Sequence, residues 1–143
     1  MLVRPALLDE ILALRHAVLR PGRPLDTARF AGDDEMTTVH VGVFDGTSVV
    51  GCASVMWRPL DDGEDAFQLR GMATAPDRMR QGIGRAVLRY LEEDIARAAG
   101  MRVLWCNART SASGFYAGAG WKLASAVFEV PDVGPHVRMI HRL

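Results

Sequence analysis

A strand-like run and an amphipathic helix are joined, within residues 69–91, by a basic loop that ends in Gly82-Ile83-Gly84. The first backbone N–H groups of a helix have no intrahelical partner and carry partial positive charge. Glycines at positions 82 and 84 let an anion approach this backbone closely. Three arginines add full positive charge around it: Arg78, Arg80 and Arg85. The segment predicts either a phosphate-binding unit or an ordinary helix start with glycine in its loop.

Spacing argues against one common kind of phosphate loop and excludes another. A dinucleotide-binding fingerprint needs a third glycine where this chain has Val87. The loop of that fingerprint also follows its strand directly, whereas here the predicted strand ends near Thr74, before Pro76. A nucleoside-triphosphate loop needs a lysine right after its second glycine, and the only lysine of the chain is Lys122. What is left is a strand, a turn containing Pro76, basic residues, and G-x-G at the start of a helix.

This arrangement resembles the acyl-coenzyme A loop of the GNAT superfamily of N-acetyltransferases. The family pattern Q/R-x-x-G-x-G/A aligns here with Met79, Gly82 and Gly84. Met79 departs from the pattern, because its side chain cannot bond a phosphate. We expect backbone amides and the adjacent arginines to make the phosphate contacts, with a weaker affinity for the cofactor as the cost.

A second segment supports the same resemblance. Residues 103–107 form a short apolar run suited to a buried strand, and a helix-entry signal follows at residues 109–111. Residues 112–121 then resemble the family element A-x-x-F-Y-x-x-x-G-F/W. The resemblance implies that Tyr116 is the general acid that protonates the departing thiolate, and that Asn107 bonds the pantetheine arm. The alternative for Tyr116 is an aromatic side chain that fills the core.

The resemblance also implies how the donor, acetyl-coenzyme A, is held. The backbone N–H of Met72 matches the family's donor to the thioester carbonyl, and the backbone of Met72 and Thr74 matches the part that pairs with pantetheine. The implied cofactor-binding residues are Met72, Thr74, Met79, Arg80, Gln81, Gly82, Gly84, Arg85, Asn107 and Tyr116.

The acceptor amine must lose a proton before it attacks, because an alkyl amine such as lysine has a pKa of about 10.4. A general base or a water chain is therefore needed. Glu129 and His136 flank the last turn and are the candidates, with His40 a weaker one. The four histidines show no metal-ligand spacing with the two cysteines, so no metal site is expected.

Periodicity and turn signals predict an α/β (α+β) fold. Helices are expected over residues 6–19, 82–99 and 112–119, and strands over 2–4, 38–45, 49–57, 66–74, 103–107, 122–130 and 136–142. The family adds detail: a mixed, mostly antiparallel central sheet of six to seven strands, flanked by about four helices and splayed between its two central strands. Residues 20–38 lack periodicity, and in the family this region shapes the acceptor pocket.

Length and composition fit one domain over residues 1–143. Seventeen acidic and seventeen basic residues balance, which argues against a nucleic-acid partner. Cys52 and Cys106 lie in apolar runs, as in proteins of a reducing compartment. Neither a signal peptide nor a membrane-spanning run is apparent, so a cytoplasmic protein without a membrane partner is expected, as a monomer or a homodimer.

The implied function is transfer of an acetyl group from acetyl-coenzyme A to a primary amine of a small molecule or peptide, by direct attack in a ternary complex. The alternative is a non-catalytic domain that senses acyl-coenzyme A. Polyamine, amino-acid and peptide acceptors all stay open at this stage.

Overall fold

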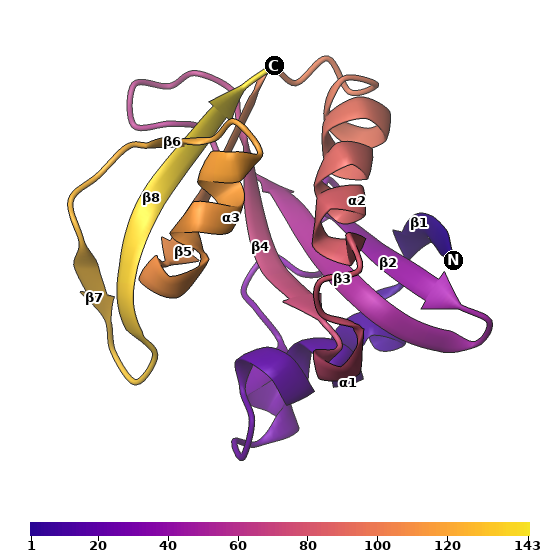
Figure 1. Ribbon diagram of the computed structural model, residues 1–143. Helices are drawn as coiled ribbons and strands as arrows, with labels where there is room; N and C mark the ends of the chain where they lie inside the picture. The colour runs from indigo at the N-terminus through magenta and orange to yellow at the C-terminus, as the bar shows by residue number, and fades with distance from the viewer.

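The computed structural model describes residues 1–143 (Figure 1). The first half of the chain contributes four antiparallel strands to a single sheet. They pair in chain order: β1 (Leu2–Ala6), β2 (Val39–Asp45), β3 (Ser48–Trp57) and β4 (Phe67–Thr74). β2 and β3 meet at a tight turn in which Gly46 has a φ of 61°, a conformation that glycine adopts at no steric cost. Helix α1 (Leu8–Leu19) connects β1 to the irregular segment that precedes β2.

The second half of the chain continues the sheet beyond β4. Its elements are α2 (Ile83–Tyr90), β5 (Val103–Arg109), α3 (Ser113–Gly118), β6 (Lys122–Leu123), β7 (Phe128–Val130) and β8 (Gly134–Arg142). The strand order is β1-β2-β3-β4-β5-β8-β6, and β7 also pairs with β8. β4 and β5 are parallel, whereas all other neighbours are antiparallel.

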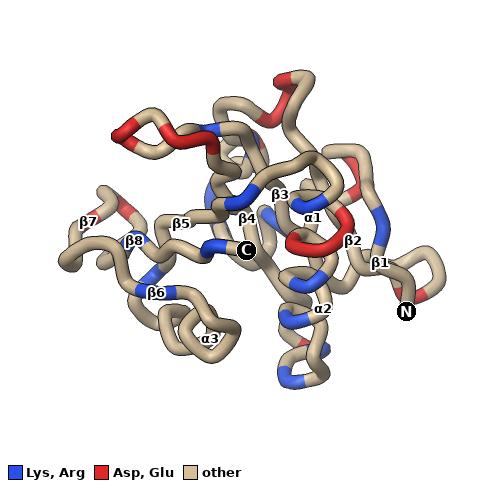
Figure 2. Tube along the Cα trace, turned by 90° about the horizontal axis from the view of Figure 1, so that it is seen from above, with Lys and Arg blue, Asp and Glu red and all other residues tan.

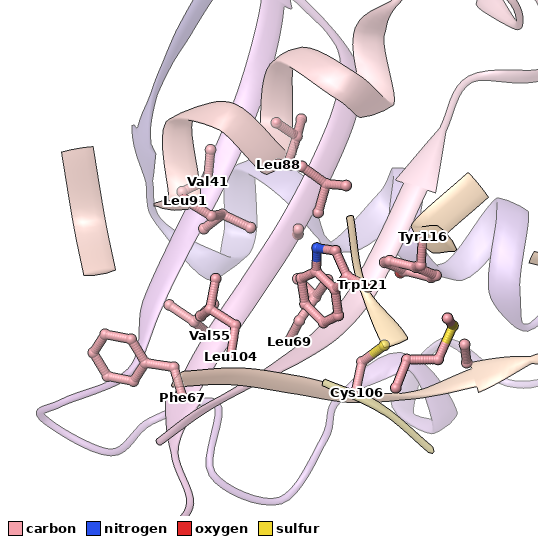
Figure 3. Packing of buried hydrophobic residues seen from close by; sticks show 14 of the residues in the cluster. Val41, Val55, Phe67, Leu69, Leu88, Leu91, Leu104, Cys106, Tyr116 and Trp121 are labelled. Atoms are coloured by element: carbon pink, nitrogen blue, oxygen red, sulfur yellow. The ribbon is translucent and has the colours of Figure 1, made fainter. Parts of the chain in front are cut away.

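The helices cover both faces of this sheet (Figure 1). α2 and α3 share one face with the main core, in which Val87 and Leu88 of α2 pack with Leu69 of β4 and Leu104 of β5 (Figure 3). α1 lies on the other face, where its Ile11 and Leu14 pack against Cys52 and Ala73. Both cysteines are buried free thiols, as their apolar surroundings in the sequence predicted.

The predicted fold class is confirmed, with differences in its details. The sheet has eight strands instead of six to seven, because residues 122–130 form two short strands on β8 instead of one long strand. There are three α-helices, slightly fewer than the family's about four, and they lie where periodicity predicted helices; residues 20–38 hold a short 3-10 turn at Leu25–Ala28. The segment expected to form one helix over residues 82–99 begins as α2 and continues as a π-helical turn at Leu91–Ala96. No helix is long and apolar enough to span a bilayer.

Candidate active site

The two central strands, β4 and β5, pair at only two positions and then separate (Figure 1). Phe67 lies opposite Leu104 and Gln68 opposite Trp105, and no further pair follows. The later residues of β4 therefore present a backbone edge to the gap between the strands. Backbone N–H and C=O groups along such an edge are free to bond a bound molecule.

A bulge in β4 lies beside this gap. On β3 the register runs from Cys52 to Ser54, while on β4 the partners jump from Ala73 to Arg70, so that Gly71 and Met72 have no partners across the ladder. Gly71 has a φ of 65°, which a bulge of this type requires of its glycine. The bulge bends β4 at Met72, the residue predicted to donate its N–H to the thioester carbonyl.

The predicted phosphate loop is an exposed turn that leads into α2. Met79, Arg80, Gln81 and Gly82 are all solvent-exposed. Arg80 and Gly82 have φ values of 63° and 78°, and no side chain caps the first turn of α2. The first backbone N–H groups of α2 can therefore donate hydrogen bonds to a bound anion, as an anion-binding helix start requires.

Gly84 lies where three elements meet. A Cβ atom built on it would lie 3.1 Å from Cζ of Phe115 on α3 and 3.9 Å from Oγ1 of Thr74 at the end of β4. One position later, Arg85 Nη1 donates to the carbonyl oxygen of Gly118 at 3.3 Å. The start of α2 thus packs on α3 across the separated strands, and a side chain at position 84 would press on the ring of Phe115.

Basic residues gather along α2 and the loop before it (Figure 2). Arg78 is paired with Asp45 in the β2–β3 hairpin, with Nη2 and Oδ2 2.6 Å apart. This hydrogen bond with Arg78 lowers the pKa of the Asp45 carboxyl. Arg78 therefore tethers the loop to the sheet, and the uncompensated positive charge of the loop comes from Arg80 and Arg85.

Tyr116 is buried in the main core between two other aromatic residues (Figure 3). Its ring lies 5.2 Å from the rings of both Phe115 and Trp121, centroid to centroid. Burial, and next the nearby Cys106, raise the pKa of the phenol above its usual value. The phenol therefore holds its proton more firmly than an ordinary tyrosine, which is itself protonated at neutral pH, the state that a general acid needs.

Asn107 lies on the opposite face of β5 from Tyr116. Cys106 and Ala108 point into the core that contains Tyr116, so Asn107 between them points toward the face of α1. There its Oδ1 accepts a 3.5 Å hydrogen bond from Nε of Arg138 on β8. The predicted pantetheine contact and the predicted acid thus approach the gap from opposite faces.

The structure does not bring the two predicted bases together. His136 is buried, pairs with Arg109 across the β5–β8 ladder, and makes a 2.8 Å hydrogen bond through Nδ1 with the carbonyl oxygen of Gly134. Glu129 is exposed on β7, and it lies beside Phe128, the residue that faces His136. Side chains alternate along a strand, so Glu129 points away from His136.

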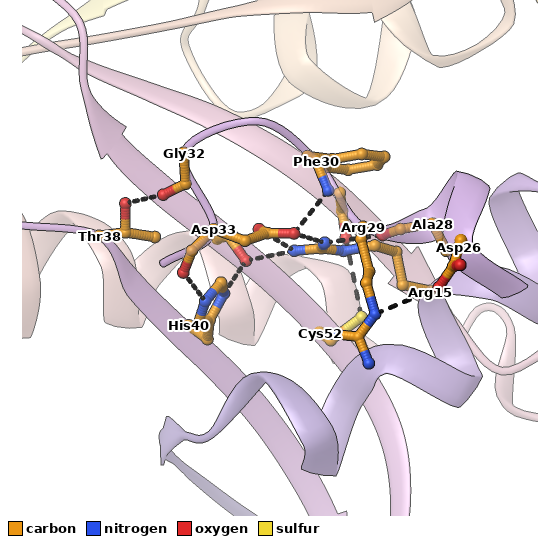
Figure 4. A network of polar contacts seen from close by, with 12 residues as sticks. Arg15, Asp26, Ala28, Arg29, Phe30, Gly32, Asp33, Thr38, His40 and Cys52 are labelled. Carbon is orange, nitrogen blue, oxygen red and sulfur yellow. Dashed lines mark hydrogen bonds and ion pairs between the residues drawn. The ribbon is translucent and has the colours of Figure 1, made fainter. Parts of the chain in front are cut away.

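His40, the weaker candidate for the base, belongs to a buried polar network on the α1 face of the sheet (Figure 4). Its Nδ1 lies 2.6 Å from Oγ of Ser54, and its Nε2 lies 2.9 Å from the carbonyl oxygen of Asp33. Both ring nitrogens are thus occupied. The imidazole has no free atom with which to take a proton from an amine.

The centre of this network is Arg15 of α1, which sequence reasoning missed. Its guanidinium donates to both carboxylate oxygens of Asp33, at 2.7 and 3.1 Å, and to Oγ of Ser54 at 2.8 Å (Figure 4). Arg15 is completely buried. A fully buried arginine with a bidentate carboxylate fixes the irregular segment after α1 against β3. An arginine on the apolar side of the predicted helix was the signal that could have found it.

A separate cavity lies outside the proposed site. A cavity of about 530 Å³ is lined by Trp57, Phe67 and Met101, at the opposite end of β4 from Thr74. No group of three or more His, Cys, Asp or Glu side chains is arranged to hold a metal ion.

Comparison with known proteins gives consistent matches. A family model described as an acetyltransferase (GNAT) domain matches residues 36–123. YitI of Bacillus subtilis strain 168, named as an uncharacterized N-acetyltransferase, is 32% identical over 143 residues, which are 99% of this chain and 95% of that protein.

Solved structures share the fold at low sequence identity. An aminoglycoside 6'-N-acetyltransferase complexed with coenzyme A has a TM-score of 0.77 and 15% identity, over 99% of this chain and 97% of that one. Escherichia coli ElaA has a TM-score of 0.79 and 18% identity, over 94% of this chain and 89% of that one.

Proposed function

Because this chain belongs to the GNAT family of acetyltransferases, we propose that it transfers an acetyl group from acetyl-coenzyme A to a primary amine in a ternary complex. The observation that carries the proposal is the gap between β4 and β5, which has a bulge at Gly71 on one side and the uncapped start of α2 at its open end. A gap of this kind offers backbone groups along its length and an anion site where it widens. These are the features that a long thioester with a diphosphate needs.

The residues present fit this donor. A Cβ built on Gly82 would meet nothing within 4 Å, and Gly82 is exposed, so its backbone is open to a bound anion. Arg80 and Arg85 supply charge, so Met79 does not have to contact a phosphate. One structural neighbour, the aminoglycoside 6'-N-acetyltransferase, was crystallised with coenzyme A bound, which supports the same assignment.

In the proposed reaction, the amine nitrogen bonds to the acetyl carbon while the carbon–sulfur bond breaks. The backbone N–H of Met72 stabilises the negative charge that gathers on the carbonyl oxygen. Tyr116 gives its phenolic proton to the sulfur and regains a proton from solvent; the phenol carries that proton at neutral pH, as an ordinary tyrosine does. The proton of the amine goes to His136 or to a water. His136 is the preferred base of the two candidates, because its side chain lies on the α1 face and that of Glu129 points away from it.

The test is release of free thiol from acetyl-coenzyme A with a panel of amines. We expect Tyr116→Phe to lower kcat by about 10²-fold, the usual contribution of a general acid, and to leave the Kd for coenzyme A unchanged. Tyr90→Phe is the matched control, because Tyr90 is the only other tyrosine and lies on α2.

One result would contradict the role of Tyr116, and another the acetyl transfer itself. Unchanged turnover in Tyr116→Phe would remove this residue from the mechanism. Binding of coenzyme A without thiol release for any amine would instead favour a non-catalytic sensor of acyl-coenzyme A.

A further inference from the structure

Three arginine side chains converge on one aromatic ring on the α1 face of the sheet. The guanidinium carbons of Arg15, Arg70 and Arg20 lie 4.3, 4.6 and 5.4 Å from the centroid of Phe30, which is half-buried. Figure 4 shows Phe30 beside the Arg15 network. Such stacking on an aromatic ring holds guanidinium groups in place without cancelling their charge.

Carboxylates neutralise only one of these arginines. Asp33 is the partner of Arg15. Neither Arg20 nor Arg70 takes part in an ion pair, and the same holds for Arg109 at the end of β5.

Arg20 and Arg109 share a neutral partner at the end of α1. They both donate to the carbonyl oxygen of Leu19, at 2.9 and 3.0 Å. A carbonyl at a helix C-terminus supplies only partial negative charge, so an excess of positive charge persists on this face.

These arginines border the gap proposed to hold the thioester. Arg70 is on β4, directly before the bulge glycine Gly71, and Arg109 is the last residue of β5. The two strands are those that separate, and Arg109 is bonded to the end of α1. The charge therefore lies where an acceptor would enter from the α1 face, opposite the face that carries α2.

Holding unpaired charge here is unfavourable. Burial, and next the charge of Arg109, lower the pKa of Arg20; burial also lowers that of Arg70, although Asp33 opposes it. Arginine stays ionised despite such shifts, so the charge persists until an anion arrives. A carboxylate matches the planar fork of a guanidinium, whereas a second cation would be repelled.

We propose that the acceptor is an amine that also bears a carboxylate, as a free amino acid does, and that Arg70 and its neighbours bind this carboxylate. This inference rests on the proposed acetyl transfer and names its substrate class. Polycationic acceptors such as polyamines are excluded by the same charge.

The experiment compares the standard amino acids, their carboxamides and spermidine as acceptors, with thiol release as the readout and calorimetry with coenzyme A alongside. We expect kcat/KM for the preferred acid to exceed that for its carboxamide and for spermidine by about tenfold or more. Amidation removes the carboxylate charge and keeps the amine, so the comparison isolates the charge.

Variants at Arg70 test the assigned residue. We expect Arg70→Met to raise KM for the acid by about tenfold, with kcat and the carboxamide kinetics unchanged, and Arg70→Lys to restore part of the loss. Arg89→Met is the matched control, because Arg89 is exposed on α2. Unchanged affinity for coenzyme A in each variant shows that the protein has folded.

The outcomes separate the two proposals. Acetylation of carboxamides or spermidine as efficient as that of acids, or an equal effect of Arg70→Met on acids and carboxamides, would overturn the carboxylate inference alone. Binding of coenzyme A with no thiol release from any amine would overturn the acetyl transfer, and this inference with it.

Discussion

The two faces of the separated strands differ in how their sites are constructed. On the α2 face, the proposed donor site consists mainly of backbone: the bulge at Gly71, the edge of β4, and the exposed turn that ends at Gly84. On the α1 face, the site consists of long charged side chains, with Arg15 and Asp33 forming a buried ion pair.

This difference determines how each site responds to change. A backbone site tolerates side-chain replacement, which explains how Met79 can stand where the family has Gln or Arg. A side-chain site depends on every partner, because one deletion leaves a buried charge without compensation. We therefore expect substitutions on the α1 face to cost stability and substitutions on the α2 face to cost affinity for the donor.

The largest effect is expected from Asp33→Ala. It leaves the fully buried guanidinium of Arg15 without its carboxylate, which should lower the free energy of unfolding by about 3–5 kcal/mol. Urea denaturation measures this change. Asp34→Ala is the control, since Asp34 is exposed and should stay within about 0.5 kcal/mol of the parent. A small loss in Asp33→Ala would show that the network is not the main anchor of this face.

Gly84→Ala should act on the other face with an intermediate effect. The added Cβ would lie 3.1 Å from Cζ of Phe115, so the ring or the start of α2 must shift where the backbone is proposed to meet the diphosphate, and we expect the Kd for coenzyme A to rise about tenfold, or ~1.4 kcal/mol. Gly114→Ala is the matched control, because a Cβ there meets nothing within 4 Å. Isothermal titration gives both affinities.

A double variant identifies what the Cβ at position 84 obstructs. If the donor is excluded directly, Gly84→Ala combined with Phe115→Ala binds coenzyme A as weakly as Gly84→Ala alone. Restored affinity would attribute the loss to a displaced Phe115 ring instead.

A smaller effect is expected when the loop loses its tether. Arg78→Ala and Asp45→Asn should each weaken coenzyme A binding by a few-fold, and the double variant should be no weaker than either, because the two side chains form one ion pair. Tighter binding in Asp45→Asn would mean that Arg78 contacts the phosphate itself once it is released.

The smallest effect concerns pH. The hydrogen bond from Arg4 lowers the pKa of Glu10 from 4.5 to about 2. A carboxyl with a lowered folded-state pKa stabilises the protein above pH 4.5 and loses this contribution as the pH falls toward 2. Stability measured by thermal unfolding between these values should therefore fall less steeply in Glu10→Gln. A parallel slope in both proteins would show that this exposed pair adds nothing.

Local patterns predicted much of the fold. The strands that end at Asp45, Trp57 and Thr74 were predicted within a residue of their observed ends, because alternation and turn residues are local signals. The glycines of the phosphate loop were recognisable for the same reason. The roles of the site residues, the location of the protein and its oligomeric state stay predictions.

The arginine cluster proposed to bind the acceptor could not be predicted, because its contacts join distant positions. Arg15 and Asp33 are 18 residues apart, Arg15 and Ser54 are 39 apart, and Leu19 and Arg109 are 90 apart. No spacing rule connects such residues. The π-helical turn after Tyr90 was missed as well, since the apolar stripe of the sequence does not distinguish it from a regular helix.

The brief pairing of β4 with β5 has a mechanical consequence. Two residue pairs between β4 and β5 form the only ladder that joins β1–β4 to the strands around β8. A molecule bound between β4 and β5 would make hydrogen bonds with the backbone of both strands, which do not pair with each other there. Occupancy of the gap would then stiffen the whole protein, and the amide protons of β4 should exchange with deuterium more slowly when coenzyme A is bound.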